Sequence, residues 1–137
     1  MTSSSFQFFR LRKDNAIQGF MRYLKPSKVF YSKDKLWWEA KQIDYSEKDS
    51  YMEVNDCNRQ WIFERDIIEM KDTQYLSVRY KAVVLFDLDL NEFTAVKLDD
   101  YQKIPKTDWH KYRLKVISFL FINPDIESNL TKKGLFI

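Results

Sequence analysis

Short runs of apolar residues recur along the chain, and polar clusters of three to six residues separate them. Runs such as Val29–Tyr31, Trp61–Phe63 and Val78–Phe86 are rich in aromatic and β-branched residues, which suit the pleated surface of a sheet. Polar clusters of this length between such runs are typical of hairpin connections. The pattern therefore predicts a mainly β chain of short antiparallel strands.

Five turns are expected between these strands. In chain order they are Lys13–Asn15, Ser32–Lys35, Ser46–Ser50, Glu64–Asp66 and Asp87–Glu92. A first strand containing Phe6–Leu11 precedes the first turn. The second and third turns are expected to close hairpins, joining Val29–Tyr31 to Leu36–Trp38 and Ile43–Tyr45 to Tyr51–Val54. The last two join Trp61–Phe63 to Ile67–Met70 and Val78–Phe86 to Phe93–Leu98.

The segment Ala16–Leu24 is compatible with a strand or a helix. Ile17, Phe20, Met21 and Leu24 recur at helical spacing. Gly19 in the middle would cost a helix roughly 1 kcal/mol relative to alanine, and the segment follows a turn-forming Asp-Asn pair. We favour a strand of a hairpin and keep the helix as the alternative.

The end of the chain predicts a helix over Pro124–Lys133, after an apolar strand over Lys115–Ile122. Asn123 is a favourable capping residue, and proline suits the first helical position because no N–H is needed there. Gly134 can adopt the left-handed conformation that ends a helix. The fold class is therefore mainly β, or β-rich α+β: an antiparallel barrel-like sheet with a short C-terminal helix.

Length and composition predict the number of domains and the cellular compartment. The 137 residues contain no proline- or glycine-rich linker, so we expect one domain over residues 1–137. A single cysteine, Cys57, cannot form an internal disulfide and suits a reducing cytoplasm. The polar stretch Met1–Ser5 does not resemble a signal peptide, and no apolar run is long enough to span a membrane.

Charge is distributed unevenly. Residues 1–37 carry eight Lys and Arg against two Asp, a net charge of +6, and the remainder carries fifteen against eighteen, a net charge of −3. A basic, aromatic-rich stretch can bind nucleic acid through phosphate contacts and base stacking. Such a site would use Arg10, Arg12, Lys13, Arg22, Lys25 and Lys28. The alternatives are solvated strand faces for the cations and a core role for the rings.

Two segments resemble a known family. Asn58–Glu69, "NRQWIFERDIIE", is similar to the turn motif of the YopX-like family, and Leu114–Ile126 is similar to its closing strand and Asn-Pro motif. Arg65 and Ser118 stand where the family has glycine. The resemblance implies a phage or prophage protein with this β-rich fold, no transferable activity or catalytic residues, and assembly of several copies as an open alternative.

Catalytic and metal-binding patterns are weak. His110 is the one histidine, and its position relative to Cys57 does not define a nucleophile–base pair. Asp87–Asn91 begins like a calcium loop, but Glu92 and Leu98 stand where glycine and a bidentate carboxylate are required. Glu69-Met70-Lys71, with Asp56 upstream, resembles the trio of a magnesium-dependent nuclease, a pattern common by chance. We therefore expect no cofactor, no metal and no enzymatic activity.

These observations rank three functions. The first is a non-enzymatic accessory or interaction protein of phage or mobile-element origin, whose partner is another protein or a second copy of this chain. The second is a small β protein that binds nucleic acid through the basic N-terminal region. The third is a magnesium-dependent nuclease that uses Glu69.

Overall fold

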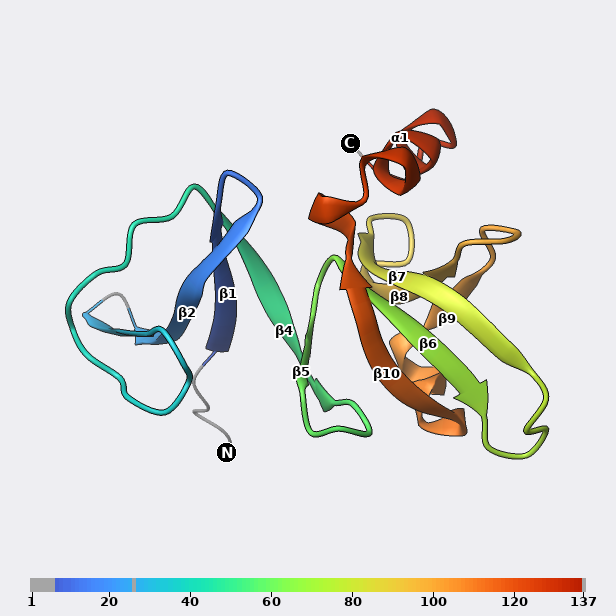
Figure 1. The fold of residues 1–137 in the computed structure, drawn as a ribbon, viewed down its shortest axis with the longest axis horizontal. Helices are drawn as coiled ribbons and strands as arrows, with labels where there is room; N and C mark the ends of the chain where they lie inside the picture. The colour runs from blue at the N-terminus through green and yellow to red at the C-terminus, as the bar shows by residue number, and fades with distance from the viewer. Residues whose placement is uncertain (1–6, 26, 137) are drawn as a thin grey trace. The chain divides into compact units, whose positions relative to one another are not determined.

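In the computed structural model, residues 7–25 and 27–136 form two five-stranded antiparallel sheets and a short C-terminal α-helix (Figure 1). This confirms the mainly β class and the terminal helix. The expectations for Met1–Ser5 and for Phe6 as the start of the first strand lie outside the described residues. Within those residues, no helix is both long and apolar enough to cross a membrane.

The chain separates into two compact units, Met1–Tyr51 and Met52–Ile137. The boundary falls inside one strand, β4, so this strand contributes residues to both units. No polar linker marks the boundary. The assignment of residues 1–137 to a single domain stays a prediction.

The first sheet has the strand order β3-β2-β1-β4-β5. Its strands are β1 (Gln7–Lys13), β2 (Ala16–Lys25), β3 (Lys28–Ser32), β4 (Glu47–Asn55) and β5 (Trp61–Phe63). Asp14 and Asn15 form the two-residue turn between β1 and β2, and both have positive φ (53° and 62°). Asp and Asn tolerate this conformation, which two-residue hairpin turns require.

The ambiguous segment Ala16–Leu24 belongs to strand β2, which confirms the favoured alternative. The close contacts around Gly19 explain why the strand needs glycine at this position. Its φ is 157°, and a Cβ atom would lie 2.7 Å from the Ser32 carbonyl oxygen and 2.7 Å from the Ile43 side chain. The backbone at Gly19 therefore approaches its neighbours more closely than any side chain permits.

The expected hairpin between Val29–Tyr31 and Leu36–Trp38 is wrong. β3 pairs with β2 instead, and its contact with the following segment is an isolated bridge between Tyr31 and Glu39. The Asp34 carboxylate accepts hydrogen bonds from the backbone N–H groups of Leu36 and Trp37, at 2.8 and 3.1 Å. These bonds hold the segment in a loop and take N–H groups that a strand would use.

The expected turn Ser46–Ser50 is also wrong, because most of it belongs to β4. β4 begins at Glu47 and pairs with β1, in a register that sets Asp49 opposite Arg10. The predicted partner strand, Ile43–Tyr45, remains irregular. A distant pairing has therefore overridden local turn chemistry.

The second sheet has the order β10-β6-β7-β8-β9. Its strands are β6 (Asp66–Asp72), β7 (Arg79–Asp87), β8 (Glu92–Lys97), β9 (Lys103–Pro105) and β10 (Tyr112–Phe119). The predicted strands and turns in this region are confirmed within a few residues, whereas β9 and the 3₁₀ turn Lys106–Lys111 were not predicted. Among the described residues the end strands of either sheet do not pair with each other, so neither sheet closes into a barrel.

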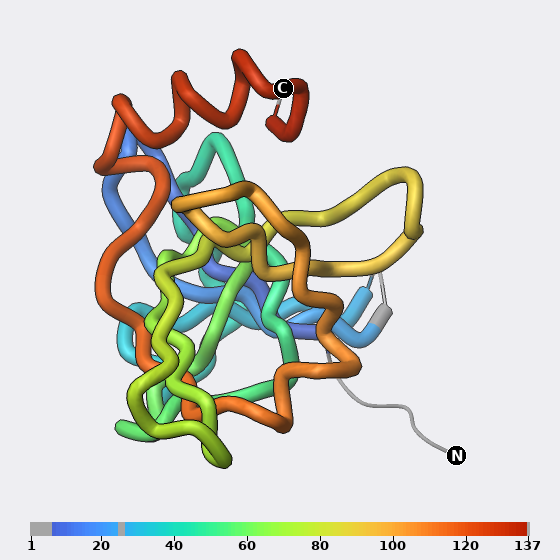
Figure 2. Tube along the Cα trace, turned by 90° about the vertical axis from the view of Figure 1, so that its right-hand side faces the viewer, coloured from blue at the N-terminus to red at the C-terminus, as the bar shows by residue number. Residues whose placement is uncertain are grey.

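Two apolar clusters pack on opposite faces of the second sheet. On one face, Ile68, Met70 and Val84 are fully buried with Met52 and Ile62. On the other face, Ile67, Val83, Leu85 and Val96 pack with Leu120 and with Leu130 of α1 (Pro124–Lys132). Figures 1 and 2 show that α1 lies across one end of this sheet. The helix therefore covers part of this second face and leaves the rest to polar side chains.

The connections around α1 differ in detail from the prediction. Asn123 does not cap the helix through its side chain, because its amide donates to Ser118 Oγ and to the Phe119 carbonyl oxygen. Pro124 is at the helix start, and Gly134, with φ of 73°, follows its end as predicted. Arg65, between β5 and β6, has a φ of 71° and occupies a conformation that favours glycine.

Candidate nucleic-acid interface

Arg10 and Arg12, two of the six cations predicted to contact phosphates, are buried. Their side chains are 2% and 3% exposed, and both bind the fully buried Asp49 carboxylate at 2.8 Å. Burial lowers the pKa of Arg12, but its hydrogen bonds to Asp49 outweigh this and raise the pKa above its usual value. Both guanidinium groups therefore hold β1 to β4 instead of facing solvent.

Lys13 and Arg22, two further predicted cations, contact different partners. Lys13 pairs with Asp44 at the surface, and the Arg22 guanidinium lies over the Trp38 and Phe30 rings, 4.9 and 5.2 Å from their centroids. Lys25 and Lys28 face each other in the register of β2 and β3, and Lys28 is exposed. Because Arg10 and Arg12 are buried, the predicted set does not form one exposed surface.

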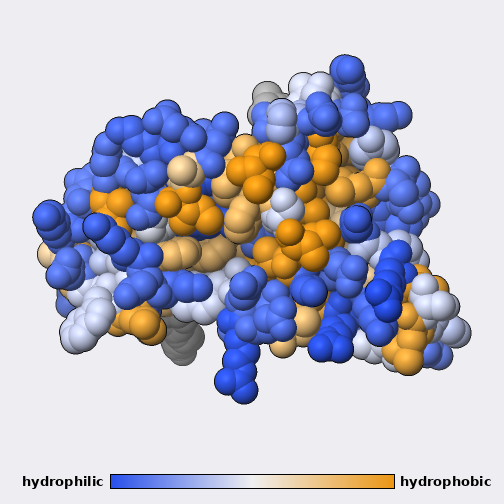
Figure 3. All heavy atoms as spheres, in the orientation of Figure 1, coloured by the Kyte–Doolittle hydropathy of each residue, from blue (hydrophilic) through white to orange (hydrophobic). Residues whose placement is uncertain are grey.

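The second sheet carries a different group of cations, which we name the basic face: Lys71, Arg79, Lys81, Arg113 and Lys115. They lie at alternating positions of β6, β7 and β10, so their side chains project to the same side of the sheet. This is the side on which α1 packs, at the end that the helix leaves uncovered. Figure 3 shows hydrophilic side chains over the lower parts of β6 and β10.

Strand register arranges the basic face in two rows. In the first row Arg113, Lys71 and Arg79 are directly opposite one another on three adjacent strands. In the second row Glu69 stands between Lys115 and Lys81. Neighbouring strands are about 4.8 Å apart, so each row is compact. A hollow of about 230 Å³ is bounded by the first row, by Glu69 and Lys115 of the second row, and by Cys57 and Asn58.

The cations of the basic face have no ion-pair partner within 4.0 Å among residues 7–25 and 27–136. Four of the five are exposed, and Lys71 is half-buried. The neighbouring carboxylate Glu69 can offset only part of this charge. The surface therefore presents a concentrated positive potential to solvent.

This surface is not among the sites that the sequence predicted. Its signal is an alternation of charged residues on three expected strands: Glu69-x-Lys71, Arg79-x-Lys81 and Arg113-x-Lys115. Alternation places each pair on one side of its strand. That the three pairs share a face depends on strand order and register, which the sequence pattern does not contain.

The residues considered for catalysis do not assemble into a site. Asp56 is buried, and its carboxylate accepts backbone N–H groups of Asn58, Gln60 and Val116, so it does not join Glu69 and Lys71. Among the described residues, no three His, Cys, Asp or Glu side chains are grouped as metal ligands would be. His110 is exposed, with its Nδ1 atom 2.9 Å from the Thr107 carbonyl oxygen.

The acidic loop after β7 forms a turn. Asp87 Oδ1 accepts the backbone N–H groups of Asp89 and Leu90, at 2.9 and 3.1 Å. Lys103 on β9 lies 2.5 Å from Asp87 Oδ2, and this contact, with the backbone hydrogen bonds, lowers the pKa of Asp87. The first oxygen of the calcium-like pattern is thus already satisfied by protein groups.

No family model, curated protein or solved structure matches the chain. The resemblance to YopX-like proteins therefore stays a prediction that rests on the two sequence motifs.

Proposed function

We propose that this protein is a non-enzymatic nucleic-acid-binding protein, and that the basic face of the second sheet contacts the phosphate backbone. The observation that carries the proposal is the row Arg113–Lys71–Arg79 across three adjacent strands. Like charges directly opposite each other destabilise a sheet. Folding alone gains nothing from this arrangement, whereas a polyanionic ligand would relieve the repulsion.

The chemistry of the face favours backbone contacts over base recognition. Guanidinium groups bind phosphate oxygens in bidentate geometry, and lysines act as point charges. Phosphate contacts position a nucleic acid without reading its sequence. We therefore expect binding with weak sequence preference, and an affinity that falls steeply with salt because bound counterions are released.

Fluorescence anisotropy with a labelled single-stranded oligonucleotide tests the proposal at low and moderate salt. The paired substitution Lys71→Gln with Arg113→Gln removes two of three charges from the first row while keeping long polar side chains. We expect at least a tenfold loss of affinity at low salt, which corresponds to about 1.4 kcal/mol. The same loss should be smaller at moderate salt, where the electrostatic term is already weakened.

A matched control uses cations of the N-terminal region. Lys13→Gln with Lys28→Gln removes the same charge from β1 and β3, so a loss caused only by net charge would be equal in the two variants. We expect the control to bind nearly as well as the wild type. Equal losses, or a larger loss in the control, would reject the basic face and favour the N-terminal site. Absence of saturable binding by the wild type at low salt would reject both.

A protein partner is the second candidate, favoured by one surface feature of the first unit. Leu36 and Trp37 are both 79% exposed, in the loop that Asp34 holds. Tryptophan is enriched among residues that dominate protein interfaces. Light scattering of the wild type and of Trp37→Ala tests self-association: a dimer that dissociates in the variant supports it, and a monomer in both rejects it.

The proposed origin and cellular compartment are compatible with nucleic-acid binding. A nucleic-acid-binding accessory protein is compatible with the phage or mobile-element origin that the YopX-like motifs imply. One cysteine without a disulfide partner suits a reducing cytoplasm, where nucleic acid is present.

A further inference from the structure

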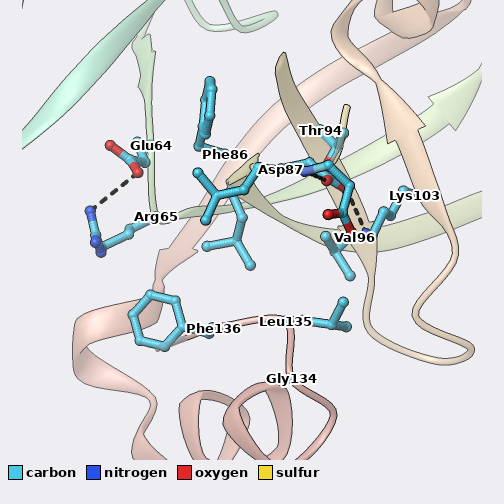
Figure 4. Close-up of a pocket in the computed structure, with 13 residues that line it drawn as sticks. Glu64, Arg65, Phe86, Asp87, Thr94, Val96, Lys103, Gly134, Leu135 and Phe136 are labelled. Carbon is cyan, nitrogen blue, oxygen red and sulfur yellow. Dashed lines mark hydrogen bonds and ion pairs between the residues drawn. The ribbon is translucent and has the colours of Figure 1, made fainter. Parts of the chain in front are cut away.

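A second hollow lies at the other end of the same unit, around the C-terminal segment. It has a volume of about 350 Å³, within the range of small-molecule sites, and is bounded by β7, β8 and Gly134–Phe136. Figure 4 shows Leu135 and Phe136 on one wall and Asp87 and Val96 on the opposite side, with the Phe86 ring directed away from them. It shares no lining residue with the basic face.

The informative residue in this hollow is Thr94. It is 1% exposed, and its hydroxyl has no hydrogen-bond partner among the described residues. Thr94 is opposite Leu85 in the register of β7 and β8, so its side chain projects to the face that carries the hollow. A buried hydroxyl without a partner destabilises the fold, and a bound ligand would supply the missing hydrogen bond.

The other lining groups define what such a ligand would look like. Asp87 projects to the same face as Thr94, and its pairing with Lys103 offsets the charge of its carboxylate. The ring of Phe136 and the side chains of Leu85 and Val96 supply apolar surface. The Arg65 guanidinium lies over the Phe136 ring, 5.5 Å from its centroid, which helps to hold the ring in place.

We propose that this hollow binds a neutral, planar heteroaromatic molecule of nucleoside size, with a polar edge directed at Thr94 and Asp87. Thr94 Oγ1 can donate or accept a hydrogen bond, and Asp87 Oδ2, which contacts Lys103, has a second lone pair that can accept one. A ring system with adjacent donor and acceptor atoms satisfies both, while its faces contact the apolar walls. The proposal stands independently of the nucleic-acid-binding function of the basic face.

The test measures ligand binding by the full chain with adenosine as the probe. Titration followed by amide NMR should shift the resonances of Thr94, Val96 and Phe136 saturably at millimolar concentrations. Thr94→Val, which replaces the hydroxyl by a methyl group of similar volume, should weaken binding at least tenfold. Thr94→Ser, which keeps the hydroxyl, should retain most of it. Lys71→Gln with Arg113→Gln should bind adenosine like the wild type.

Stability provides an independent readout. Without ligand, Thr94→Val should raise the Tm by roughly 2–4 °C, because it removes a buried polar group without a partner. Thr73→Val is the control, since the Thr73 hydroxyl donates to the Lys111 carbonyl oxygen, and its Tm should stay unchanged or fall. No saturable shift with adenosine, equal binding by Thr94→Val, or a lower Tm for Thr94→Val would each overturn the proposal.

Discussion

β1 and β10 carry the same arrangement of cations, with Arg10 and Arg12 on one and Arg113 and Lys115 on the other, two residues apart. On β1 the neighbouring strand β4 sets acids opposite them, with Asp49 and Glu47 in register. On β10 the neighbouring strand β6 sets Lys71 and Glu69 opposite them.

Because of this pairing, the first pair of cations becomes part of the interior and the second remains available to a ligand. Asp49 binds both arginines of β1, whereas Lys71 repels Arg113 across β10 and β6. A count of basic residues therefore does not locate a binding surface. The charges on the neighbouring strand determine whether a cation stabilises the fold or faces an external anion.

The largest expected effect is on the stability that the buried arginines of β1 and Asp49 provide. Asp49→Ala leaves two buried guanidinium groups without their shared carboxylate, which should cost about 3–5 kcal/mol of unfolding free energy. Urea denaturation of the full chain measures it. Asp44→Ala, which removes an exposed partner of Lys13, should change stability by no more than about 0.5 kcal/mol. Similar losses in the two variants would mean that the burial of Asp49 confers no special role.

The exposed cations of β10 predict how nucleic-acid affinity depends on salt. Arg113→Gln should reduce the slope of log affinity against log salt concentration by about 0.7 for a single-stranded ligand, because one phosphate contact is lost. Anisotropy titrations over a series of salt concentrations measure the slope. An unchanged slope would show that Arg113 does not contact a phosphate.

A smaller effect tests the repulsion within the first row. Lys71→Gln removes the central charge between Arg113 and Arg79 and should raise the unfolding free energy by about 0.2–1 kcal/mol. Urea denaturation at low salt measures this gain, which should shrink as salt screens the charges. A loss of stability would show that Lys71 contributes more through packing than it costs through repulsion.

The smallest effect concerns pH and the pair between the buried Asp87 and Lys103. Because the pKa of Asp87 is lowered in the folded protein, its contribution to stability is present above the unfolded value of about 3.9 and is lost as pH falls through the folded value. Thermal unfolding from about pH 5 to about pH 2 should therefore show a smaller drop in Tm for Asp87→Asn than for the wild type. Parallel curves would contradict this role.

Local chemistry in the sequence predicted much of the fold. Asp14-Asn15 marked the first hairpin, and Pro124 and Gly134 marked the ends of the terminal helix. The loop at Leu36–Trp38 was missed because one carboxylate, Asp34, binds the N–H groups that a strand would use. The start of β4 was missed because its pairing with β1 joins residues more than thirty positions apart.

The candidate sites were harder to predict for a related reason. The basic face requires the order and register of three strands, and the Thr94 hollow requires the C-terminal segment to fold back near β7 and β8. Residue spacing along the chain predicts to which side of a strand a side chain projects. It does not record which other strand lies beside it.

The two glycines should follow different evolutionary courses. At Gly19 any added carbon would meet a backbone oxygen at 2.7 Å, so homologues that keep this hairpin should retain glycine there. At Gly134 a side chain would have open space around it, and only its φ of 73° disfavours other residues. Asparagine tolerates that conformation, so position 134 is expected to drift between glycine and asparagine while position 19 stays fixed.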